Sequence, residues 1–99
     1  MALASVAGRR VLFIMATDHE YGQCLRARMK PLITGVGPVE AAIGTSICLQ
    51  HLSTVDALPD LVVSIGSAGS KRCRLGEVYQ IDRVSWRDMD ASAIGFPLG

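Results

Sequence analysis

The sequence has few aromatic residues, little net charge and no long apolar run. Aromatic residues make up 5% of the 99 residues, and ten basic against nine acidic residues leave a net charge of +1. So small a charge gives no reason to expect nucleic acid or an anionic membrane as a partner. The longest apolar stretch, Val11–Ala16, is far shorter than the roughly 20 residues of a membrane-spanning helix. With 49% hydrophobic residues, the composition favours a globular, aliphatic domain.

Cysteine is also scarce, and its pattern argues against a disulfide or metal framework. Cys24, Cys48 and Cys73 are odd in number and show no metal-ligand spacing. We interpret them as reduced thiols and expect no metal site. Two arginines follow the small apolar segment Met1–Gly8 instead of preceding it, which is the wrong order for a secretory signal. We therefore expect a cytoplasmic protein.

Apolar runs and turn residues predict an α/β domain. A run of six apolar residues without glycine or proline is typical of a buried parallel strand. We expect strands at residues 10–16, 30–34, 61–65 and 78–84, and helices at 18–29 and 39–52. The first three strands should be parallel and joined by right-handed crossovers.

The second helix has the clearest sequence pattern. Pro38 suits a first helical position, and apolar residues recur at helical spacing behind it. We expect these residues to face the core: Val39, Ala42, Ile43, Ile47 and Leu52. Three small residues should allow close packing on a sheet: Ala41, Gly44 and Ser46.

Two helices cannot cover both faces of a doubly wound sheet. The segment from Trp86 to Gly99 supplies no further helix. We therefore expect a three-layer sandwich with a mixed, mainly parallel sheet, of which this chain forms about half. Alternatively, a partner chain covers the open face.

Each of the first three predicted strands ends in a polar or glycine-rich turn. The turns are Thr17–Glu20, Gly35–Pro38 and Gly66–Gly69, the last reading Gly-Ser-Ala-Gly. In a parallel sheet the carboxyl ends of the strands share one edge, where open α/β sheets bind ligands. Glu20, Gly37 and Ser67 are therefore expected to line one cleft.

Each of these residues also has a purely structural interpretation. Glu20 suits the first turn of a helix, where the helix dipole favours a carboxylate. The Gly66–Gly69 segment suits an ordinary tight turn, and Ile94 and Phe96 suit a core. For Asp88 and Asp90 we prefer hydrogen bonds to local backbone over a metal or acid–base pair.

Four motifs in order resemble one enzyme family. They are the segments 14–20, 35–42, 63–69 and 87–96. Together they resemble the amino-terminal half of the 5′-methylthioadenosine/S-adenosylhomocysteine nucleosidases, in the purine nucleoside phosphorylase and nucleosidase superfamily. On this resemblance, residues 1–99 form the amino-terminal half of such a domain.

The resemblance implies a cytoplasmic, homodimeric hydrolase of nucleoside catabolism and methionine salvage. It would release adenine from an adenine nucleoside with water as acceptor and no cofactor. Glu20 matches the carboxylate that activates the water, which suits a general base. The positions that match substrate-binding residues are Gly35, Val36, Gly37, Ser67, Ala68 and Gly69. Ile94 and Phe96 match residues that cross the dimer interface to cover the 5′-alkylthio group.

Departures from the family pattern leave alternatives open. Phosphorylases of the superfamily carry a phosphate-binding arginine at the position of Ser64, and the acidic turn at Asp18 and Glu20 would repel phosphate. Water is therefore the better acceptor. No residue here matches the family's general acid or its Glu-Met-Glu ribose clamp, and residues 21–34 form a shortened connection. A nucleoside-binding half-domain without catalysis, a structural half-domain and a phosphorylase are the alternatives.

Overall fold

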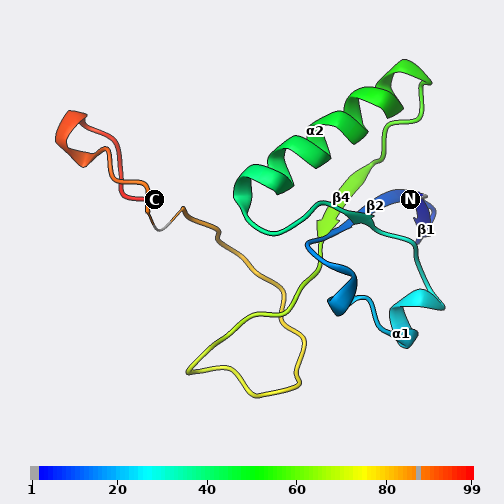
Figure 1. Ribbon diagram of the computed structural model, residues 1–99, viewed down its shortest axis with the longest axis horizontal. Helices are drawn as coiled ribbons and strands as arrows, with labels where there is room; N and C mark the ends of the chain where they lie inside the picture. The colour runs from blue at the N-terminus through cyan, green and yellow to red at the C-terminus, as the bar shows by residue number, and fades with distance from the viewer. Residues whose placement is uncertain (1–2, 87) are drawn as a thin grey trace. The chain divides into compact units, whose positions relative to one another are not determined.

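The computed structural model describes residues 3–86 and 88–99, and the chain divides into two compact units, Met1–Gly69 and Ser70–Gly99. The first unit contains a sheet and the long helix α2 (Figure 1). The second contains one short 3₁₀ helix, η2, at Ser92–Ile94. Within the described residues, no helix combines the length and apolar character needed to cross a membrane.

The sheet is built around one central strand, β2 (Arg9–Met15). Strand β1 (Ala4–Val6) pairs with its start in antiparallel fashion, and β3 (Leu32–Ile33) pairs with its end in parallel. Strand β4 (Leu61–Ser64) pairs in parallel along Val11–Ile14. Because Val11 and Ile14 each have two partners, β4 occupies one edge of β2 while β1 and β3 share the other. The predicted α/β class and mixed sheet are confirmed.

Strand β1 was not predicted. It forms a hairpin with β2 through Ala7 and Gly8, which have positive φ angles of 52° and 78°. Two such residues are what a tight two-residue hairpin turn requires. Alanine rarely adopts this conformation, so Ala-Gly gives a weaker turn signal than Asn-Gly.

Helix α2 (Pro38–Thr54) lies against one face of the sheet and begins at Pro38, as predicted. The core on this face joins the fully buried Leu12 to Cys48 and Leu52, with Ile14 and Leu49 packed around them. The helix passes Thr34, which follows β3, at Gly44, where a Cβ would lie 3.4 Å from Thr34 Cγ2.

The predicted core stripe of α2 is wrong except at Leu52. Val39, Ile43 and Ile47 are exposed at 62%, 52% and 66%, and Ala42 is exposed as well. The face turned inward carries Ala41, Gly44, Thr45, Cys48, Leu49 and Leu52. Small side chains lie near Thr34, and Leu49 and Leu52 supply the apolar contacts farther along the helix.

Two further predicted elements differ. The helix expected at 18–29 is instead a 3₁₀ turn, η1 (Asp18–Glu20), and a single helical turn, α1 (Gln23–Arg26), separated at Gly22. The prediction of a strand at 78–84 is wrong, because those residues have no regular structure and no pairing strand within the described chain. Alternation alone does not form a strand without a partner to complete the backbone hydrogen bonds.

Candidate functional site

The three turns predicted to converge all lie at the carboxyl end of β2. The backbone pairing continues past the strands on both sides: Ile65 N–H donates to Ile14 O at 3.0 Å, and Gly35 N–H donates to Ala16 O at 3.0 Å. Parallel pairing therefore carries the β3 and β4 turns to the same edge as the η1 turn that follows β2.

Glu20 and Ser67 are in direct contact at this edge. The Oε2 atom of Glu20 accepts one hydrogen bond from Ser67 N–H at 2.5 Å and a second from Ser67 Oγ at 2.8 Å. Gly66 precedes the contact, and a Cβ there would lie 3.2 Å from the same oxygen. Glycine thus permits the carboxylate to approach the strand end closely.

This contact favours the charged form of the carboxylate. The Ser67 backbone N–H, and next the Ser67 hydroxyl, lower the pKa of Glu20 because they stabilise its charged form, while partial burial opposes them. A glutamate is already ionised at neutral pH, and this contact stabilises that form further. Both hydrogen bonds use Oε2, and within the described residues Oε1 has no hydrogen-bond partner.

The loop before α2 has the backbone that its glycines allow. Gly35 and Gly37 have φ angles of 95° and 98°, in the region that other residues avoid. Gly37 is the N-cap of α2, and its carbonyl accepts from Ala41 N–H at 3.0 Å. Val36, between the two glycines, is exposed.

The four remaining predicted site residues are exposed. Ala68 and Gly69 follow Ser67 in an exposed stretch without regular structure. Ile94 and Phe96 belong to the second unit, where both side chains are exposed. Their predicted roles stay predictions.

Asp90 hydrogen-bonds locally, as preferred above. Its Oδ1 accepts from Ser92 N–H at 3.0 Å and from Ser92 Oγ at 2.7 Å, ahead of η2. The hydroxyl, and next the N–H, of Ser92 lower the pKa of Asp90. Within the described residues, no group of three His, Cys, Asp or Glu side chains is placed to hold a metal ion.

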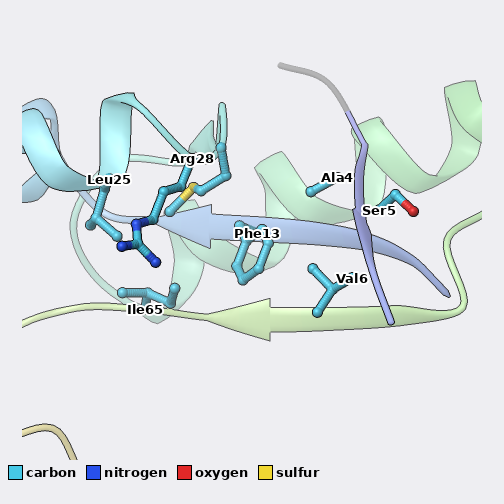
Figure 2. Close-up of a pocket in the computed structure, with 8 residues that line it drawn as sticks. Ala4, Ser5, Val6, Phe13, Leu25, Arg28 and Ile65 are labelled. Carbon is cyan, nitrogen blue, oxygen red and sulfur yellow. The ribbon is translucent and has the colours of Figure 1, made fainter. Parts of the chain in front are cut away.

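A separate cavity of about 510 Å³ lies on the sheet face opposite α2. Phe13 projects into it (Figure 2), because neighbouring residues of a strand point to opposite faces and Leu12 faces the helix. Leu25 and Arg28 line it from the α1 side and Ile65 from beyond β4. None of the predicted site residues lines this cavity.

Sequence reasoning missed the packing around Tyr21. The predicted helix at 18–29 gave Tyr21 no role, yet this residue organises the segment between Glu20 and Met29. Its hydroxyl donates to Met29 O at 2.5 Å, and the guanidinium of Arg26 lies 4.3 Å from its ring centroid. The available signal was an aromatic residue directly after Glu20 with an arginine five positions beyond it.

Comparison with known proteins supports the family resemblance. The chain is 40% identical over 70 residues to a protein named 5′-methylthioadenosine/S-adenosylhomocysteine nucleosidase from Haemophilus influenzae (strain PittEE). The match covers 69% of this chain and 28% of the relative, so the chain matches less than a third of that protein's length. No protein-family model matches the chain.

Proposed function

Because the matched part of this chain belongs to the 5′-methylthioadenosine/S-adenosylhomocysteine nucleosidase family, we propose that it supplies the water-activating side of a nucleosidase site. The reaction is hydrolysis of the bond between adenine and ribose in nucleosides of the methylthioadenosine and adenosylhomocysteine type. The observation that carries the proposal is the Glu20–Ser67 contact at the carboxyl ends of two neighbouring parallel strands.

Glu20 is the general base. Its ionised carboxylate takes a proton from water as the water attacks the anomeric carbon, and the glycosidic bond breaks with its electron pair leaving on adenine. Ser67 holds Oε2, which leaves Oε1 to meet the water. The lowered pKa of Glu20 reduces its proton affinity, so water activation depends on the oxocarbenium character of the sugar.

The Gly35–Gly37 loop and the Ser67–Gly69 stretch bind the nucleoside in this proposal. Gly35 and Ser67 lie at the edge where Glu20 lies, and glycine lets the backbone approach a ligand closely. Ile94 and Phe96 cover the 5′-alkylthio group across a homodimer. These assignments rest on the family resemblance.

Water is the acceptor that this site favours over phosphate. Asp18 and Glu20 place acidic side chains in the η1 turn, and Ser64 at the end of β4 carries no charge. An anion such as phosphate is repelled by acidic groups and finds no cation among these residues. A phosphorylase is the alternative that the assay must separate.

The test is adenine release from methylthioadenosine, measured with and without added phosphate. Two proteins are compared: the 99-residue chain, and a chimera in which this chain replaces the matching segment of the Haemophilus influenzae relative. We expect little turnover from the chain alone, because no residue in it matches the family's general acid, and phosphate-independent turnover from the chimera.

In the chimera, Glu20→Gln should lower kcat by about 10²–10⁴-fold, the usual value of general-base catalysis, with KM nearly unchanged. The amide keeps the shape and an acceptor but cannot take a proton. Glu40→Gln on the first turn of α2 is the matched control and should retain activity. Full activity of the Glu20 variant would reject the base assignment, and turnover that requires phosphate would establish a phosphorylase.

A further inference from the structure

The two sides of the Glu20–Ser67 contact are supported by different kinds of structure. Ser67 follows directly from β4, whose hydrogen bonds to β2 extend to Ile65. Glu20 ends a three-residue 3₁₀ turn, η1, that contains no buried residue. The neighbouring helix α1 has four residues and likewise buries none. A helix this short is not stable by itself, so other contacts must hold the segment that carries Glu20.

Tyr21 provides these contacts. Its N–H donates to Asp18 O at 3.0 Å, which closes η1 immediately after Glu20. Its carbonyl accepts from Arg26 Nε at 2.9 Å, and the Arg26 guanidinium lies 4.3 Å from its ring centroid. Its hydroxyl donates to Met29 O at 2.5 Å. We name the three residues Tyr21, Arg26 and Met29 the tyrosine clamp.

The clamp fixes the residue next to Glu20 from several directions. The bonds run from backbone and side chain of Tyr21 to residues before and after it, so they restrict both the position and the rotation of its backbone. Because consecutive residues share a planar peptide unit, a fixed Tyr21 also limits the directions that the Glu20 side chain can take. The cation–π contact between Arg26 and the Tyr21 ring adds to these hydrogen bonds.

We propose that the tyrosine clamp is a positioning device for Glu20: it holds the η1 turn so that the Glu20 carboxylate meets Ser67. Tyr21 and Arg26 do not touch the reacting atoms in this proposal, and they act through Glu20. The catalytic meaning of the clamp rests on the proposed function, whereas its effect on the Glu20–Ser67 contact does not.

The experiment follows the titration of Glu20 in the 99-residue chain by carbon NMR. The chain has three glutamates, Glu20, Glu40 and Glu77, so labelling of glutamate carboxyl carbons gives three signals, and Glu20→Gln identifies the one from Glu20. In Tyr21→Phe, which removes only the hydroxyl bond to Met29, the midpoint for Glu20 should rise towards that of an ordinary glutamate. If the Tyr21 hydroxyl only stabilised the fold, its removal would leave the titration midpoint of Glu20 unchanged as long as the chain remained folded.

Tyr79→Phe is the matched control. The Tyr79 hydroxyl accepts from Arg74 N–H at 3.0 Å within the second unit, so this variant removes a similar bond outside the clamp and should leave the midpoint unchanged. Arg26→Gln removes the cation–π contact and the Arg26 Nε bond to the Tyr21 carbonyl while keeping the Tyr21 hydroxyl. This variant replaces Tyr21→Phe in the experiment if Tyr21→Phe does not fold. An unchanged Glu20 midpoint in the folded clamp variants would overturn the proposal.

The titration needs no turnover, so it separates the clamp from the nucleosidase assignment. If the protein releases no adenine in any form, the proposed function fails while the midpoints still decide the clamp. In any form that does release adenine, Tyr21→Phe should lower kcat by up to about 10²-fold with little change in KM, as for a misplaced catalytic group. An unchanged kcat together with a raised midpoint would overturn the catalytic meaning of the clamp.

Discussion

At the scale of single residues, Glu20 combines two features that a water-activating carboxylate needs. One oxygen is held by Ser67, and the other has no partner within the described chain. A carboxylate has lone pairs on both oxygens, so holding one fixes the direction of the other without blocking it. The Ser67 N–H and hydroxyl do this while keeping the group ionised.

The Glu20–Ser67 bonds should also make the stability of the chain depend on pH. The pKa of Glu20 is lowered in the folded chain, so its contribution is fully present above the unfolded pKa of about 4.3 and is lost as pH falls through the folded value. In urea titrations between pH 7 and pH 3, the parent should lose more stability on acidification than Glu20→Gln does. Asp90 contributes separately and cancels in this comparison.

The control for this measurement is Glu40→Gln, which removes the same charge from the first turn of α2. Because Glu40→Gln leaves the Glu20–Ser67 bonds in place, the change in acid sensitivity should be larger for Glu20→Gln than for Glu40→Gln. If the parent and Glu20→Gln lost stability equally, the Glu20–Ser67 bonds would have no energetic role in solution.

At the scale of helices and strands, the sequence predicted the elements whose signals are local. An unbroken apolar run marked β2, a similar run marked β4, and Pro38 marked the start of α2. Parallel pairing of these strands then explains why Glu20 and Ser67 lie at one edge. The predicted geometry of this edge thus follows from strand direction alone.

The features that sequence could not supply depend on non-local contacts. Residues 78–84 alternate like a strand but have no partner within the described residues. The inward face of α2 is set by its packing against Thr34 and Leu12, so Ile43 and Ile47 lie outside. The tyrosine clamp is local in sequence, but it depends on side-chain conformations around Gly22. The spacing of apolar residues does not predict these conformations.

The close approach of α2 to β3 leads to a prediction for Gly44. A Cβ at this position would lie 3.4 Å from Thr34 Cγ2, which is ordinary van der Waals contact. Alanine in a helix interior is favoured over glycine by roughly 0.5–1 kcal/mol, so Gly44→Ala should raise the free energy of unfolding by about that amount. Gly44→Leu should lower it by about 1–3 kcal/mol through overpacking. Urea denaturation measures both changes.

Ser46→Ala is the control, because Ser46 lies on the exposed side of the same helix. It changes helix propensity without changing the contact with Thr34. A clear loss of stability in Gly44→Ala, with none in Ser46→Ala, would show that the packing at Thr34 has no room for a methyl group.

At the scale of the whole chain, the first unit consists of a sheet and the helix α2, and each of them exposes an apolar surface on the side away from the other. On α2 the exposed stripe consists of Val39, Ile43 and Ile47. On the opposite face of the sheet lies the cavity around Phe13 (Figure 2). In a three-layer sandwich, a further layer of helices would cover this second face. No such layer is present in the described residues, so the three-layer sandwich stays a prediction. Exposed apolar patches of this kind usually mark surfaces that contact another protein segment.

We therefore expect the 99-residue chain to self-associate through the α2 stripe. Sedimentation velocity over a range of protein concentrations should show species larger than a monomer, because association removes the side chains of the stripe from water. The double substitution Ile43→Gln with Ile47→Gln should shift the distribution towards monomer, since both residues are exposed and their replacement leaves the core around Leu12 intact. Leu75→Gln removes a fully exposed apolar side chain from the second unit and should leave the distribution unchanged. A compact, cooperatively unfolding monomer at every concentration would show that the stripe needs no partner, and it would count against the view that this chain forms about half of a larger domain.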